Sequence, residues 1–227
     1  MENQNFTALN DYFCEKSNMK QDVYKKTLEA FRIIKDASAS IIDDLKAKKE
    51  DESHELDLHY NSIGSYEAEL MFAGDALSIQ MHTNVFAFPQ DHFINNLSEV
   101  KKDKTNGYVG MILIYNFLAD SLRYKRIADV GYLIGRIFIN KEGNYFVDGQ
   151  RTLSFLYQNF ENQKFDSEAA RNIIQAAMKQ AIDFDLFVPP YDQVKEVSLQ
   201  QKIVQQGNTS IKTGKRLGFI YNSSEND

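Results

Sequence analysis

The chain has few of the residues that restrict a protein's class. Its 227 residues include one cysteine, no tryptophan, three prolines and eleven glycines. The single Cys14 cannot form an intramolecular disulfide, which excludes a disulfide scaffold and fits a reducing compartment. The low proline and glycine content excludes collagen-like and low-complexity chains. The longest nearly apolar run, residues 109–118, is about half of a bilayer-spanning helix, so we expect no membrane segment.

Catalytic and targeting signatures are missing as well. The sequence contains no Gly-rich phosphate loop, dinucleotide fingerprint, nucleophile elbow or Cys-x-x-Cys pair. The first residues carry no positive charge and precede no apolar run, so we expect no signal peptide and a soluble cytoplasmic protein. These absences favour a non-enzymatic protein. They do not exclude an enzyme, because many active sites leave no local motif.

The composition that remains is globular, with its negative charge concentrated in one segment. Hydrophobic residues make up 43% of the chain, charged residues 26%, and the formal net charge is −6. Residues 43–69 hold nine acidic and three basic residues, and this difference accounts for the whole net negative charge of the chain. The acidic balance argues against a nucleic-acid partner. A basic stretch at residues 195–216, with Phe219 and Tyr221 nearby, weakens that argument only slightly.

A long helix is expected over residues 21–50. One stripe recurs there in steps of three and four residues, and neither glycine nor proline interrupts it. Its members are Tyr24, Thr27, Phe31, Ile34, Ser38, Ile41 and Leu45. Some 30 residues would span roughly 45 Å, so this helix either crosses the domain or protrudes toward a partner. Residues 1–20 are mixed and polar, with a short helix expected near residues 9–13.

Several consecutive strands are expected after the long helix. Alternation of polar and apolar residues over 55–60, 66–72 and 77–82 predicts an antiparallel meander, and residues 84–88 extend it. After a short helix at 91–100, residues 108–118 fit a central strand or a buried helix, and we favour the strand. Asn140 to Gly143 predicts a hairpin turn between strands within 132–147.

The C-terminal part is expected to be helical. Asp166 is a helix cap, and Pro189-Pro190 ends the helix that it begins. A last helix over 193–205 and a hairpin over 211–221 complete the pattern. The fold class is therefore α+β, a mostly antiparallel sheet packed by a long N-terminal helix and C-terminal helices. We expect one domain over residues 1–227, with residues 1–20 and 222–227 as loosely ordered ends.

One candidate site lies on the polar face of the meander. Strand parity places His59, Glu67, Glu69 and His82 on this face, where neighbouring strands are ~4.8 Å apart. Imidazoles and carboxylates that converge could hold a divalent metal and activate water for hydrolysis. Polar residues more commonly line the solvent face of an amphipathic sheet, and no other cofactor is expected. A metal-dependent hydrolase is thus the first alternative function.

A second candidate is Arg136, which lies in an otherwise apolar strand. Such an arginine must pair or reach solvent, and Asp148 on the partner strand is a natural partner. It could also act as an anion clamp, because Gly131 and Gly135 would let a ligand approach the backbone. The sensor of a small anionic ligand is the second alternative. The long helix and the acidic segment instead favour a binding or assembly module, whose partner is another protein or a second copy.

Overall fold

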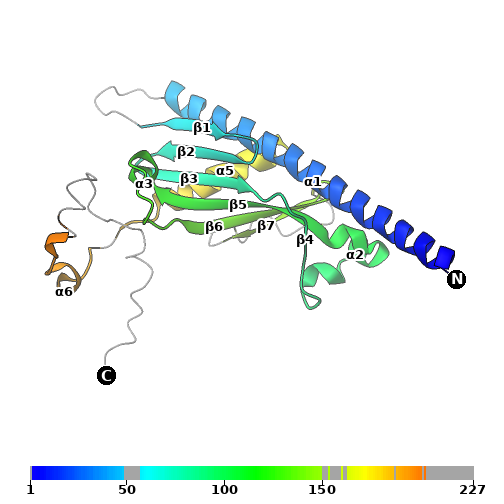
Figure 1. Cartoon of the computed structure of the whole chain (residues 1–227). Coiled ribbons are helices and arrows are strands. Elements are labelled where there is room, and N and C mark those ends of the chain that lie inside the picture. The colour runs from blue at the N-terminus through cyan, green and yellow to red at the C-terminus, as the bar shows by residue number, and fades with distance from the viewer. Residues whose placement is uncertain are drawn as a thin grey trace.

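The protein consists of one long helix, an antiparallel sheet and a second packed helix (Figure 1). A computed structural model describes residues 2–48, 57–149, 153, 160, 163–186, 188–200 and 202. In chain order the elements are α1 (Glu2–Ala47), β1 (His59–Ile63), β2 (Glu67–Phe72), β3 (Asp75–Met81), β4 (Phe86–Ala87), the 3-10 helix η1 (Phe93–Asn96), α2 (Ser98–Lys102), the 3-10 helix η2 (Lys104–Gly107), β5 (Tyr108–Leu118), α3 (Ala119–Arg123), β6 (Tyr132–Asn140), β7 (Tyr145–Gly149), α5 (Ser167–Ile182) and α6 (Tyr191–Val194).

The sheet confirms the expected α+β class. Its order is β1-β2-β3-β5-β6-β7, β4 pairs with the start of β5, and all seven strands are antiparallel to their neighbours. Residues 108–118, which the sequence left between strand and helix, form the central strand β5. No helix in the described part of the chain combines the length and apolar character that crossing a bilayer requires.

α1 and α5 cover one face of the sheet. Phe31 and Ile34 of α1 are fully buried against strand residues such as Leu70 and Ile79, in a core that α5 completes. Truncation of a core phenylalanine such as Phe31 to alanine typically costs about 3–5 kcal/mol. The expected stripe of α1 is therefore the face that packs. The opposite side of the sheet, called the open face below, carries the polar meander residues.

The start of α1 differs from the expectation. The sequence predicted a separate short helix within a loosely ordered segment, but α1 runs without a break from Glu2. No glycine or proline occurs before residue 48, so nothing ends the helix locally. Phe6, Leu9 and Phe13 also keep the helical phase of the packed stripe. Figure 1 shows these first turns of α1 extending past the ends of the strands, beyond α2.

Several boundaries also differ. β1 begins at His59 and continues to Ile63, three residues past the alternation expected over 55–60. The turn comes at Gly64, whose φ of +62° favours glycine. Gly143 has φ +77°, as the predicted hairpin turn requires, and the Asp166 carboxylate accepts a hydrogen bond from the Ala169 amide as a cap. The helix predicted over 193–205 is wrong in its first part, because α6 ends at Val194 and residues 195–198 are not helical. Residues 201 and 203–205 of this helix and the hairpin predicted over 211–221 lie outside the described residues.

A second, smaller core covers one end of the open face. Residues 86–102, called the cover segment, fold back over β5, β6 and β7. Ile94 and Val100 of this segment are buried with Val109, Phe138 and Phe146 from the strands. This explains why β5 has apolar residues on both sides: Ile112 and Ile114 contact the helices, whereas Val109 contacts the cover segment.

Candidate functional site

The open face is organised as rows of side chains that the strand register brings together. One row crosses the whole sheet and consists of Ile63, Glu67, Gln80, Leu113, Arg136 and Asp148. The row has the Glu67 carboxylate at its β2 position and the Arg136–Asp148 ion pair at its β6 and β7 positions. Glu67 accepts hydrogen bonds from Ser78 and Gln80, each at 3.2 Å. Burial raises the pKa of the neighbouring Glu69 above its usual value, and the Glu67 carboxylate adds to this effect.

The four residues proposed as metal ligands share the open face but do not converge. His59 faces Met71 at one end of the sheet, and its Nε2 lies 2.7 Å from an Asp57 oxygen. His82 follows β3 at the other end, about six strand residues or ~20 Å away. Its Nδ1 accepts a hydrogen bond from the Asn84 amide. Among the described residues, no group of three or more histidine, cysteine, aspartate or glutamate side chains could hold a metal ion.

Arg136 does pair with Asp148. The two residues face each other on β6 and β7, and both Nε, at 3.0 Å, and Nη2 of the guanidinium donate to the same carboxylate oxygen, Oδ2. The side chains remain 42% and 49% exposed, so the pair is accessible to solvent. The guanidinium carbon also lies 5.3 Å from the centre of the Phe138 ring.

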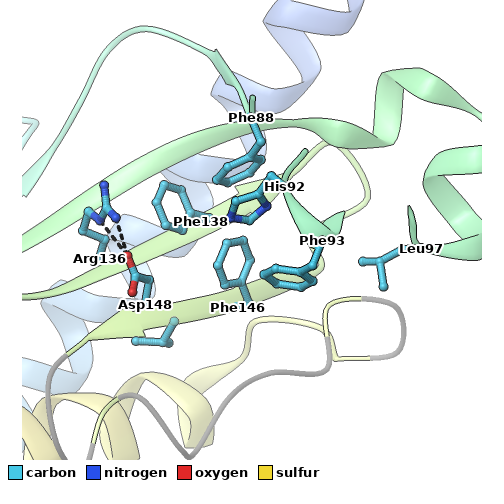
Figure 2. A pocket seen from close by; sticks show the side chains of 9 residues that line it. Phe88, His92, Phe93, Leu97, Arg136, Phe138, Phe146 and Asp148 are labelled. Atoms are coloured by element: carbon cyan, nitrogen blue, oxygen red, sulfur yellow. Dashed lines mark hydrogen bonds and ion pairs between the residues drawn. The ribbon is translucent and has the colours of Figure 1, made fainter. Parts of the chain in front are cut away.

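This ion pair forms one end of a cavity between the open face and the cover segment (Figure 2). The volume is about 500 Å³, within the range of small-molecule sites. The other walls are Phe88, His92, Phe93 and Leu97 from the cover segment and Phe138, Phe146 and Val147 from the sheet. Figure 2 shows the rings of Phe138 and Phe146 side by side, with the His92 ring above Phe146.

The rings in the cavity are packed against one another. Phe88 stacks on His92 with 4.2 Å between ring centres, and Phe138 stacks on Phe146 at 4.8 Å. His92 Nδ1 accepts a hydrogen bond from the Ile94 amide, 3.4 Å away, at the start of η1. A neutral imidazole that accepts at Nδ1 carries its proton on Nε2, which leaves that nitrogen as a donor.

A second candidate surface is the first part of α1. Every residue from Asn5 to Glu15, called the projecting segment, is exposed. Four of its side chains are large and apolar, with Phe6 68%, Leu9 62%, Tyr12 60% and Phe13 66% exposed; we call them the projecting stripe. The helix meets the body of the protein at Lys16, whose ammonium donates to the Tyr108 hydroxyl at 2.5 Å. Met19 is the first buried side chain after the projecting segment.

Sequence reasoning located Arg136 and its partner but missed both the cavity and the projecting stripe. The cavity depends on residues 86–102 folding over strands that follow later in the chain, and no local pattern encodes that. The stripe had a visible signal, because Phe6, Leu9 and Phe13 are three and four residues apart. Phe219 and Tyr221 lie outside the described residues.

Comparisons with protein-family models, with curated proteins and with solved structures find no match for this chain.

Proposed function

We propose that this chain is a protein-binding module and that the projecting stripe is its contact surface. The observation that carries the proposal is the exposure of four large apolar side chains on helical turns that extend past the sheet. Each is about two-thirds exposed, so together they present on the order of 500 Å² of apolar surface. Apolar patches of this size on soluble proteins are often interaction sites.

The shape of the stripe favours a groove on the partner. Phe6, Leu9 and Phe13 have the i, i+3, i+7 spacing with which amphipathic helices anchor in hydrophobic grooves. With Tyr12 included, the stripe covers about 120° of the helix circumference at 100° per residue. That arc is wider than the narrow seam of a two-stranded coiled coil. Two such stripes paired together would bury only about 1,000 Å² in total, the lower limit for a stable interface.

The charges favour a different protein over a second copy as the occupant. The chain's own apolar groove, about 310 Å³, lies between α1 and α5 and is lined by Ile41, Leu45, Met178 and Ile182. Lys48, Lys179, Arg171 and Asp44 also line this groove, so its charged residues sum to a net charge of +2. The stripe is followed on the same side of α1 by Lys16 and Lys20. Bringing a second copy's stripe to this groove would therefore place lysines near lysines, which is unfavourable.

The experiment uses Cys14, which is exposed and is the chain's one cysteine. A photo-crosslinker attached to Cys14 captures the neighbour of the projecting segment from an extract of the source cells. The captured protein is then purified and titrated with the unlabelled chain by calorimetry. Capture identifies a candidate, and only binding between the two purified proteins supports the proposal.

Two matched variants decide whether the stripe makes the contact. Leu9→Asp places a charge in the stripe, and Cys14→Asp places the same charge about 140° around the helix. Loss of a buried anchor costs 2 kcal/mol or more, so Leu9→Asp should weaken binding at least about 30-fold. Cys14→Asp should stay within about threefold of the wild type. Equal binding by wild type and Leu9→Asp, or self-association of the pure chain through the stripe, would overturn the proposal.

A further inference from the structure

We propose that the groove between α1 and α5 binds a small amphiphile with one alkyl chain and an anionic head group, a ligand of the fatty-acid class. The groove begins at Ile41, ~39 Å along α1 from the end of the projecting segment, so this site is independent of the protein contact. Its volume is about 310 Å³, or roughly ten groups of the size of a water molecule or a methylene. An alkyl chain of roughly eight to ten carbons has this size.

The apolar walls of the groove are aliphatic. Ile41 and Leu45 lie one turn apart on the same face of α1, and Met178 and Ile182 have the same relation on α5. No aromatic side chain is among the residues that line the groove. Such walls fit a flexible alkyl chain, and the unbranched thioether of Met178 can adapt to its shape.

The exposed apolar surface of the groove is too small for a protein partner. Ile41 and Met178 are buried, whereas Leu45 and Ile182 are 39% and 50% exposed. Two partly exposed side chains offer far less than the ~800 Å² that each protein contributes to a standard interface. A small ligand that lies between Leu45 and Ile182 is the better match for this surface.

The charges at the groove favour an anionic head group. Arg171 pairs with Asp44, so these two charges cancel, and Lys48 and Lys179 leave a net charge of +2. Within the described part of the chain, neither of these lysine side chains forms a hydrogen bond or an ion pair. The C-terminal ends of α1 and α5 contribute about −0.5 each, which is less than the charge of the two ammonium groups. A carboxylate near Lys48 and Lys179 is therefore attracted to the groove.

Octanoate and octyltrimethylammonium provide matched probes, because their straight alkyl chains are similar in length and their charges are opposite. Binding is followed by two-dimensional NMR through the methyl groups of Leu45, Met178 and Ile182. Burial of a few methylenes beside two lysines predicts a Kd on the order of 1 mM for octanoate at low ionic strength. Octanoate should bind in a saturable manner and at least about fivefold more tightly than octyltrimethylammonium.

Two results with these probes would overturn the proposal. One is the absence of a saturable shift at the groove methyl groups with octanoate at up to ~20 mM. The other is tighter binding of octyltrimethylammonium, which would show that the acidic residues 50–52, next in the sequence after Lys48, outweigh the lysines. Hexanoate has two methylenes fewer and should bind at least about fourfold more weakly than octanoate. Equal affinities of the two acids would contradict an alkyl chain in the groove.

Two lysine variants decide whether the charge preference comes from the groove. Lys48→Gln removes a lysine that lines the groove, and Lys46→Gln removes one about 160° around the same helix. Both side chains are exposed, so both variants should stay folded. Lys48→Gln should weaken octanoate binding at least about threefold, whereas Lys46→Gln should change it less than about 1.5-fold. Unchanged octanoate affinity in Lys48→Gln, or an equal loss in both variants, would contradict the proposed site.

Discussion

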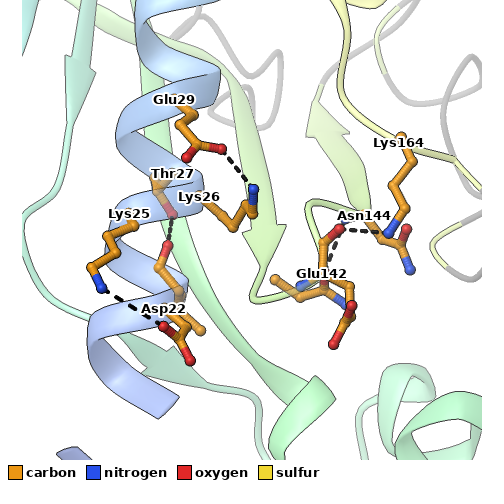
Figure 3. A network of polar contacts seen from close by, with 10 residues as sticks. Asp22, Lys25, Lys26, Thr27, Glu29, Glu142, Asn144 and Lys164 are labelled. Atoms are coloured by element: carbon orange, nitrogen blue, oxygen red, sulfur yellow. Dashed lines mark hydrogen bonds and ion pairs between the residues drawn. The ribbon is translucent and has the colours of Figure 1, made fainter. Parts of the chain in front are cut away.

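Gly110 of β5 lies directly under Thr27 of α1, so close that a Cβ added to the glycine would stand 2.0 Å from the Thr27 hydroxyl oxygen. The hydroxyl is held in place because it donates to the Val23 carbonyl one turn back, at 2.7 Å (Figure 3). The helix therefore approaches the sheet closely at a position where the strand has no side chain. The hydrogen bond to Val23 also satisfies the Thr27 hydroxyl, which explains how a fully buried threonine fits in an apolar stripe.

Gly110→Ala should destabilise the fold by about 1–3 kcal/mol, because the added methyl group overpacks the contact between α1 and β5. The measurement is urea unfolding followed by far-UV circular dichroism. Thr27→Ala removes the hydroxyl oxygen and Cγ2, two of the three atoms nearest to the added methyl group. The double variant should therefore recover part of the loss, and a double variant no more stable than Gly110→Ala would contradict this account.

Asp103 should make the stability depend on acid pH. Lys141 and Thr105 hydrogen-bond its carboxylate and lower its pKa to about 2. The folded pKa is below the unfolded value of about 3.9, so the stabilisation is present above about pH 4 and is lost as the pH falls toward 2. Because the side chain is 45% exposed, solvent screening leaves about 1 kcal/mol of this effect.

The difference in unfolding free energy between wild type and Asp103→Asn isolates this group from the other carboxylates. It should favour the wild type at pH 6 and shrink as the pH approaches 2. A difference that is the same at both pH values would show that Asp103 is not held in its ionised form by Lys141.

Charges introduced into the projecting stripe should leave the isolated protein folded. Phe13→Asp replaces a side chain that is 66% exposed, so the unfolding free energy should change by no more than about 0.5–1 kcal/mol. Phe13→Asp should also bind less of an apolar dye than the wild type does. The purified wild type should give a native mass of one 26.2 kDa chain. A dimer that Phe13→Asp dissociates would instead identify a second copy as the partner.

Local patterns were sufficient for most elements. The spacing of Phe31 and Ile34 predicted the packed face of α1, and Asn140 to Gly143 predicted the β6–β7 turn, because 3.6-residue periodicity and positive φ are local properties. The two-residue alternation of the strands placed His59 and His82 on one face. It could not show that they lie at opposite ends of that face, because distance along a sheet depends on register between strands.

The cavity required long-range information. Phe93 and Phe138 are 45 residues apart in the chain and line one cavity only because the cover segment folds back across β5 and β6. Asp148 was identified as a partner for Arg136 because a hairpin has a register that its turn fixes. The role of that pair beside an aromatic cavity depends on packing that no local periodicity encodes.

Amide hydrogen exchange over residues 5–15 is the most direct test of the protein-binding account. Exposed turns at the end of a helix are marginally stable, so these amides should exchange within seconds in the isolated chain, whereas those near Phe31 and Ile34 remain protected. Addition of the purified partner should protect residues 5–15 strongly. Fast exchange of these residues in a saturated complex, with new protection elsewhere on the chain, would contradict the claim that the projecting stripe makes the contact.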